Sequence, residues 1–176
     1  MIAILSVNSP MNTRIIALFL LLSLGACNSN EDAPDVSGIK IQLTQQHFEH
    51  DFFAIDTNQL DQSILALDKK YPGFTTVFLS NILALMPASE SSDLKSFYSA
   101  YLPLYKQSTS IFKEQKKQAQ KIEQGFQYLK HYFPSYQLPN KLITFIGPIN
   151  SFGSILTEDA IAIGLQLFMG KDHPLY

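Results

Sequence analysis

The sequence predicts an α+β fold, a mainly helical domain with a small mixed sheet, and three observations support that prediction. Residues 38–43 alternate apolar and polar side chains, as a half-buried strand does. Apolar residues then recur at helical spacing through much of residues 60–133. Two short apolar runs, residues 141–147 and 160–165, follow late in the chain and are typical of strands.

The first expected helix begins after a capping residue, Thr57 or Asn58. It ends at residues 71–73, Tyr-Pro-Gly, because proline removes a backbone donor and glycine permits a turn. Its apolar residues are spaced as on one face of a helix: Leu60, Ile64, Leu65 and Leu67.

Three more helical segments are expected before residue 134. A second, more buried helix covers residues 74–85, and a third opens at Ser91 or Ser92, with Pro103 expected to break or restart it. The longest element is expected from residue 104 to residue 133, with a lysine-rich face in solvent and one narrow apolar stripe. The stripe consists of Ile111, Gln115, Ala119, Ile122, Phe126, Leu129 and Phe133.

The two late strands, residues 141–147 and 160–165, are expected to be neighbours in one sheet, joined through a loop that includes residues 148–154. The long helix is expected to cover one face of that sheet. Too few residues follow Leu165 to add another crossover unit, which needs a dozen or more. We therefore expect an incomplete domain, truncated at its C-terminus and poorly stable alone.

The N-terminus has the pattern of a bacterial lipoprotein signal peptide. Arg14 precedes an apolar run, Ile15 to Leu24, which is too short for a spanning helix of roughly 20 residues. Gly25, Ala26 and Cys27 follow, an order that resembles the lipobox, whose cysteine receives a diacylglycerol. We expect lipidation of Cys27, and with it a membrane anchor in the cell envelope, in the inner or the outer membrane and on the periplasmic or the surface side.

Cysteine usage supports this interpretation over an ordinary secretory signal with an incidental cysteine. Cys27 is the only cysteine, so there is no disulfide framework, and lipid would consume a thiol otherwise open to oxidation. The expected organisation is a signal peptide in residues 1–26, an acidic polar tether in residues 27–37 and one domain in residues 38–176. Met11 is an alternative start to Met1. The acidic tether also resembles a surface-export signal, with a plain periplasmic tether as the equal alternative.

Charge and motifs exclude several classes of function. The net charge of −2 and the pI near 6.0 do not suggest a polyanion partner, because nucleic-acid-binding modules usually carry a clustered basic face, so no nucleic-acid partner is expected. No His-Glu-x-x-His, Gly-x-Ser-x-Gly or phosphate-binding glycine loop occurs in the 176 residues. We expect no catalytic residue and no cofactor, and an enzyme is not favoured.

Two local groups of ionisable residues are candidate sites. His47, His50 and Asp51 could place two imidazoles on one helical face to bind zinc, but a strand-like context splays them to opposite faces. We favour polar boundary residues and assign no metal site. Glu158 and Asp159 are adjacent and point different ways, so they are expected to precede a strand or cap a turn.

Six segments of the chain form a recognisable pattern: Asp51-Phe-Phe, Leu67 to Pro72, Tyr132-Phe-Pro, Leu138 to Gly147, Glu158 to Leu165 and Leu167 to Gly170. Together they resemble the gliding-motility lipoprotein GldB family. The family pattern has Asp after Ile-Gly-Leu, where this chain has Gln166, and family members continue far beyond the point that matches Tyr176.

The resemblance implies a non-enzymatic lipoprotein of the Bacteroidota cell envelope that supports gliding motility and the associated secretion machinery. Its expected partners are the membrane, through the lipid, and other gliding or secretion lipoproteins and envelope proteins. The alternative that the resemblance leaves open is a zinc-peptidase-like hydrolase whose metal-binding helix lies beyond residue 176.

Overall fold

The computed structural model describes residues 33–86, 90–113 and 116–174. Residues 36–174 belong to one compact unit, with the predicted α+β fold. The signal peptide and Cys27 lie outside the described residues, so both stay predictions. Within the described part of the chain, no helix is both long enough and apolar enough to cross a bilayer.

A four-stranded mixed sheet forms the middle of this unit, in the order β1-β2-β4-β3. β1 and β2 are parallel, as are β2 and β4, whereas β3 runs antiparallel to β4. β2 is buried along nearly its whole length, which explains its continuous apolar sequence. The strands are β1 (Thr44–His47), β2 (Lys141–Phe145), β3 (Ser154–Leu156) and β4 (Ala160–Gly164).

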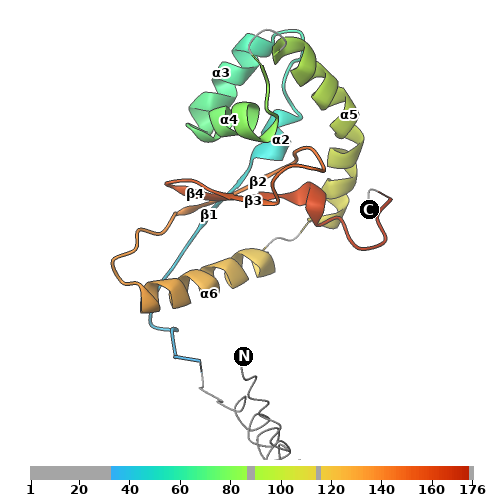
Figure 1. The fold of residues 1–176 in the computed structure, drawn as a ribbon. Coiled ribbons are helices and arrows are strands. Elements are labelled where there is room, and N and C mark those ends of the chain that lie inside the picture. Colours follow the sequence, from blue (N-terminus) through green and yellow to red (C-terminus); the bar gives the residue numbers. More distant parts are fainter. Residues whose placement is uncertain (1–32, 87–89, 114–115, 175–176) are drawn as a thin grey trace, which may run out of the picture. The chain divides into compact units, whose positions relative to one another are not determined.

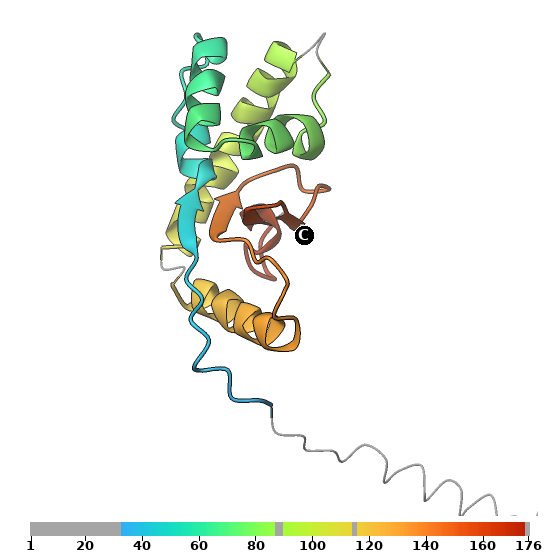
Figure 2. The ribbon, with the colours of Figure 1, turned by 90° about the vertical axis from the view of Figure 1, so that its left-hand side faces the viewer.

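Helices cover the two faces of the sheet unequally. α2 to α5 lie on one side of the sheet and α6 lies alone on the other, in both ribbon views (Figure 1, Figure 2). The helical elements are α2 (Phe48–Phe52), α3 (Leu60–Lys70), α4 (Phe74–Val77), the π-helical turn η1 (Phe78–Ile82), α5 (Glu90–Ile111), α6 (Lys116–Tyr132) and the 3₁₀ turn η2 (Leu165–Leu167).

The sheet therefore separates two apolar clusters. The main core is aromatic: the Phe78 ring is fully buried, and its centroid lies 4.7 Å from that of Phe48 and 5.0 Å from that of Phe52. The smaller cluster lies under α6, where Ala119 is the fully buried helix residue. Its other members are Leu43, Ile122, Phe126, Leu142, Ile161 and Ile163.

The early strand was predicted in the wrong place. Residues 38–43 contain a turn and unpaired extended backbone, and the strand follows at Thr44–His47. Two side chains of α6 form hydrogen bonds with the backbone of residues 38–43. Glu123 Oε1 accepts the N–H of Leu43 at 2.9 Å, and Gln127 donates to the carbonyl of Ile39 at 2.7 Å. The alternation of apolar and polar residues in 38–43 therefore arises from packing against α6, where Leu43 is buried.

The helical predictions were right about existence and partly wrong about limits. α3 and the α4–η1 segment match the first two expected helices, although Leu65 is exposed. Pro103 does not break the third helix, which runs through it to Ile111. Pro103 and Ser99 are both exposed, so water can bind the carbonyl that proline leaves free. The expected long helix is two helices, since α5 ends at Ile111 and α6 begins at Lys116.

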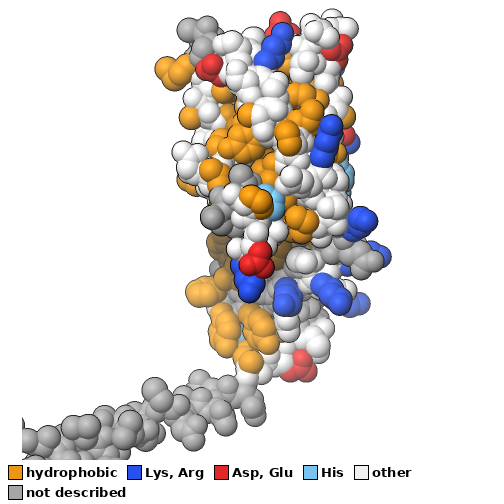
Figure 3. Space-filling view, turned by 90° about the vertical axis from the view of Figure 1, so that its right-hand side faces the viewer, with side chains coloured by type: hydrophobic (Ala, Val, Ile, Leu, Met, Phe, Trp, Pro, Cys, Tyr) orange, Lys and Arg blue, Asp and Glu red, His pale blue; other side chains and the backbone are white. Residues whose placement is uncertain are grey.

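The late strands are confirmed as parallel neighbours, β2 and β4, and α6 covers one face of the sheet as expected. The loop between them contains the short strand β3, which the sequence analysis missed. The expected solvation of the lysine-rich face is confirmed, because Lys116, Lys117 and Lys121 are exposed. On the face in Figure 3, most lysine side chains lie in the lower half, at the height where Figure 1 shows α6.

Candidate functional site

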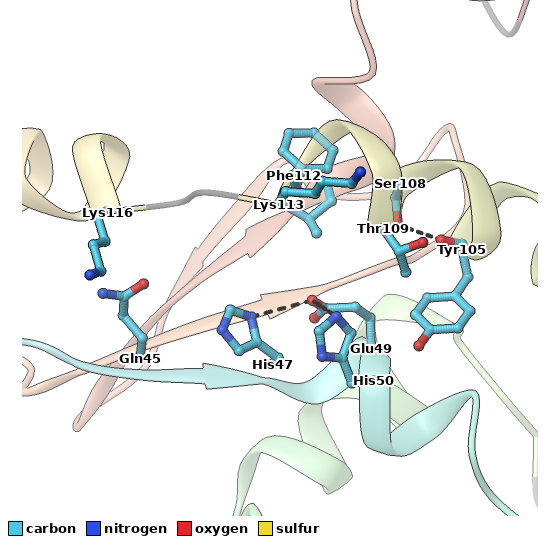
Figure 4. A pocket seen from close by; sticks show the side chains of 11 residues that line it. Gln45, His47, Glu49, His50, Tyr105, Ser108, Thr109, Phe112, Lys113 and Lys116 are labelled. Atoms are coloured by element: carbon cyan, nitrogen blue, oxygen red, sulfur yellow. Dashed lines mark hydrogen bonds and ion pairs between the residues drawn. The ribbon is translucent and has the colours of Figure 1, made fainter.

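The junction of β1 and α2 carries the candidate site. Phe48 and Phe52, one turn apart on α2, are both buried in the main core and fix the orientation of this short helix. His47, Glu49 and His50 are thereby held at the boundary between the core and an open cleft (Figure 4).

Glu49 is the centre of this group, with only 1% of its surface exposed. Its Oε1 atom accepts the hydroxyl proton of Thr144 at 2.9 Å and lies 3.5 Å from Nδ1 of His47 and 3.7 Å from Nε2 of His50. Figure 4 shows a nitrogen of each imidazole directed at this oxygen. The other carboxylate oxygen, Oε2, is buried and has no hydrogen-bond partner among the residues that the structure describes.

The hydroxyl of Thr144 links His47 and Glu49 by hydrogen bonds. The Thr144 hydroxyl donates to Glu49 and can at the same time accept the proton on Nδ1 of His47, which lies 3.1 Å away. The hydrogen bond to Glu49 raises the pKa of His47 above its usual value, and this effect outweighs the opposing effect of burial. The raised pKa means that His47 keeps its proton to a higher pH than a free histidine does.

Asp51 faces α3. Its carboxylate lies 2.7 Å from Nζ of Lys70 and accepts the Tyr71 hydroxyl. Burial alone would raise the pKa of Asp51, but the hydrogen bonds from Lys70 and Tyr71 lower it overall. Burial and then the bond to Asp51 raise the pKa of Tyr71. This pair of bonds ties α2 to the end of α3 and so supports the geometry around Glu49.

The cleft in front of Glu49, here called the Glu49 cleft, has a volume of about 700 Å³. Its walls combine a buried carboxylate with lysine, imidazole, amide and hydroxyl groups, so it suits a polar ligand that carries both donors and acceptors. The lining residues are Gln45, His47, Glu49, His50, Tyr105, Ser108, Thr109, Phe112, Lys113, Lys116 and Leu165.

The two histidines do not splay as the sequence analysis expected. His47 ends β1 and His50 lies in α2, and the change of conformation between them stacks the rings, with centroids 5.0 Å apart. Within residues 33–86, 90–113 and 116–174, no group of three or more His, Cys, Asp or Glu is placed to hold a metal ion.

The remaining ionisable pair behaves as expected. Glu158 and Asp159 lie in the turn before β4, where Thr157 N–H donates to the carbonyl of Ala160. Asp159 lies 2.5 Å from Nζ of Lys141, and the hydrogen bond from Lys141 lowers the pKa of Asp159. Both carboxylates are exposed, and neither lines the Glu49 cleft.

Glu49, Thr144 and Tyr105 belong to the site but were not predicted from the sequence. A signal for Glu49 was present, because it lies three positions before Phe52 and so shares the buried face of α2. Thr144 lies 95 residues from Glu49 along the chain and only the sheet register brings it there. No local pattern marks Tyr105.

Gln166 is fully buried. Its Oε1 accepts the N–H of Gly147 at 3.0 Å, and its Nε2 faces the carbonyl of Phe152 at 3.5 Å. This amide therefore joins the end of β2 to the following loop.

The fold and the cleft together define a small α+β domain whose polar cleft is suited to binding. The family model of gliding motility protein GldB matches residues 29–176, and the chain belongs to this family. GldB is a lipoprotein family, so membership implies a lipid-anchored envelope protein with a role in gliding motility. No curated protein and no solved structure matches the chain.

Proposed function

We propose that this protein is lipidated on Cys27 and supports gliding motility and the associated secretion machinery as a non-enzymatic binding component of the cell envelope. The family match over residues 29–176 carries the proposal, together with the lipobox-like residues that end at Cys27. Its binding partners would be other gliding or secretion lipoproteins and envelope proteins.

The Glu49 cleft is the proposed contact for such a partner. Glu49 Oε2 is buried and has no donor within the described part of the chain, which is costly, and a donor supplied by a bound segment would remove that cost. Lys113 and Lys116 at the wall can bind acidic groups of the same segment.

The described hydroxyls of the cleft support binding over nucleophilic catalysis. Ser108 donates to the carbonyl of Tyr105 at 2.7 Å and Thr109 to that of Lys106 at 2.8 Å, within their own helix. Neither is hydrogen-bonded to His47 or His50, as an activated nucleophile would be. We find no observation in the described residues that favours the hydrolase alternative.

A gene-deletion strain tests the proposal through colony spreading and the amount of secreted protein in the medium. Loss of both, restored by the wild-type gene, is expected. Complementation with Glu49→Gln should fail, whereas Glu158→Gln, a matched change at an exposed carboxylate, should restore both. A deletion strain that spreads and secretes normally would rule out the proposed role, and normal secretion without spreading would remove the secretion link alone.

A further inference from the structure

The end of α6 presents exposed aromatic rings on a short turn. Tyr132 is 61% exposed, Phe133 59% and Tyr136 42%. The turn is held in place, because Tyr136 N–H donates to the carbonyl of Phe133 at 3.0 Å and Lys130 Nζ donates to that of Tyr136 at 3.1 Å. Residues 132–136 are here called the aromatic turn.

The N-terminal chain enters the domain at the same end. Leu43 is bonded to Glu123 and Ile39 to Gln127, so going back four residues in the chain advances one turn toward the C-terminal end of α6. The chain then makes a turn, in which Ile39 N–H donates to the carbonyl of Val36 at 2.9 Å, so Val36, the first residue of the unit, stays close to Ile39 and to the C-terminal half of α6. Figure 1 and Figure 2 show this segment running beside α6 and away from the sheet.

Chain length limits the distance from this end to the lipid. Cys27 lies nine positions before Val36. A fully extended chain spans at most about 3.3–3.6 Å per residue, so the reach is about 30 Å. With lipid on Cys27, the end that holds Val36 and the aromatic turn is held close to the bilayer.

The chemistry of the aromatic turn fits the membrane–water interface. Tyrosine places an apolar ring among acyl chains and a hydroxyl among headgroups, and phenylalanine adds apolar area. Lys130 and His131 lie in the last turn of α6, and no acidic residue occurs from Gln124 to Lys141. This segment itself therefore adds no negative charge that anionic headgroups would repel.

We propose that the aromatic turn docks onto the surface of the membrane that holds the lipid on Cys27, so that the domain has a fixed orientation rather than swinging on its tether. This inference rests on the proposed lipidation of Cys27. A partner protein or a second copy on the same surface are the competing outcomes of the test.

The chain contains no tryptophan, so one introduced tryptophan reports on a single place. Phe133→Trp probes the aromatic turn. Phe152→Trp is the matched control. Phe152 is 54% exposed and follows the C-terminal end of β2, whereas the aromatic turn precedes the N-terminal end of that strand. Each lipidated full chain is reconstituted into vesicles of phosphatidylethanolamine and phosphatidylglycerol with brominated acyl chains, and tryptophan fluorescence is recorded. Flotation of the vesicles reports separately on the lipid anchor.

The Phe133→Trp protein should show blue-shifted emission that brominated lipid quenches, and the Phe152→Trp protein neither effect. Flotation with equal quenching of both proteins, or of neither, overturns docking but leaves the anchor standing. A blue shift that persists in unbrominated detergent micelles and rises with protein concentration identifies a second copy on this surface and also overturns docking. A chain that does not float and carries no lipid mass overturns the proposed lipidation, and docking with it.

Discussion

Replacing the buried Gln166 separates the effect of a lost hydrogen bond from that of a buried charge. Gln166→Leu keeps most of the side-chain volume but removes the acceptor for Gly147 N–H, which is buried. A buried donor left without a partner costs about 1–3 kcal/mol. The contact to Phe152 at 3.5 Å is at the limit of a hydrogen bond and adds little. We expect a loss of about 1–3 kcal/mol that does not depend on pH.

Gln166→Glu keeps the acceptor and replaces the amide donor with a second oxygen facing the carbonyl of Phe152. Burial should raise the pKa of the new carboxyl in the folded protein above its unfolded value of about 4.3. Below that unfolded value both states are protonated, so the variant should be nearly as stable as the wild type. Its stability should fall as the pH rises through the interval between the two pKa values, and then stay low.

Urea denaturation followed by circular dichroism measures both variants from about pH 4 to about pH 8, since each carboxyl pKa in question lies within or near this range. The wild type at each pH is the control. The reasoning is refuted if Gln166→Leu unfolds with the wild-type free energy, or if the deficit of Gln166→Glu is the same at both ends of the range.

Three further outcomes are expected. Phe78→Ala should lower the free energy of unfolding by about 3–5 kcal/mol, because a fully buried ring is removed, while Leu65→Ala at an exposed site should change it by under about 0.5 kcal/mol in urea denaturation. Glu49→Gln should lower the pKa of His47, as measured by NMR titration, and an unchanged pKa would contradict the assigned cause. In the wild type, the stabilisation that the raised pKa provides is fully present below the usual pKa of 6.5 and is lost as the pH rises through the pKa of the folded protein. Cys27→Ser should abolish palmitate labelling and release the protein from membranes; wild-type labelling of the variant would disprove lipidation at Cys27.

The sequence predicted those elements whose cause is local. The buried runs of β2 and β4 and the apolar spacing of α3 follow from side chains a few residues apart, and these elements lie where expected. The strand expected at residues 38–43 failed because alternation marks burial on one side and does not say whether a strand or a helix does the burying. Here α6 buries Leu43, from about 80 residues away.

The candidate site also depends on contacts between residues far apart in the chain, which local sequence does not predict. His47 and His50 were visible as a pair, but whether they splay or converge depends on where β1 stops, one residue before α2 begins. Thr144 reaches Glu49 only because β1 and β2 pair with His47 opposite Thr144. Strand register is a property of the whole sheet, so no window of sequence around either residue contains it.

The division of the apolar side chains between two faces of the sheet bears on how the domain fluctuates. α6 contributes one fully buried residue, Ala119, whereas the opposite face holds the aromatic core. Detaching α6 therefore costs far less than unfolding the domain, and its amide hydrogens should exchange with solvent well before those of β2. In that open state Leu142, Ile161 and Ile163 are exposed to solvent while the aromatic core stays packed. An apolar sheet face that can associate with other apolar surfaces is then exposed transiently on an otherwise native protein.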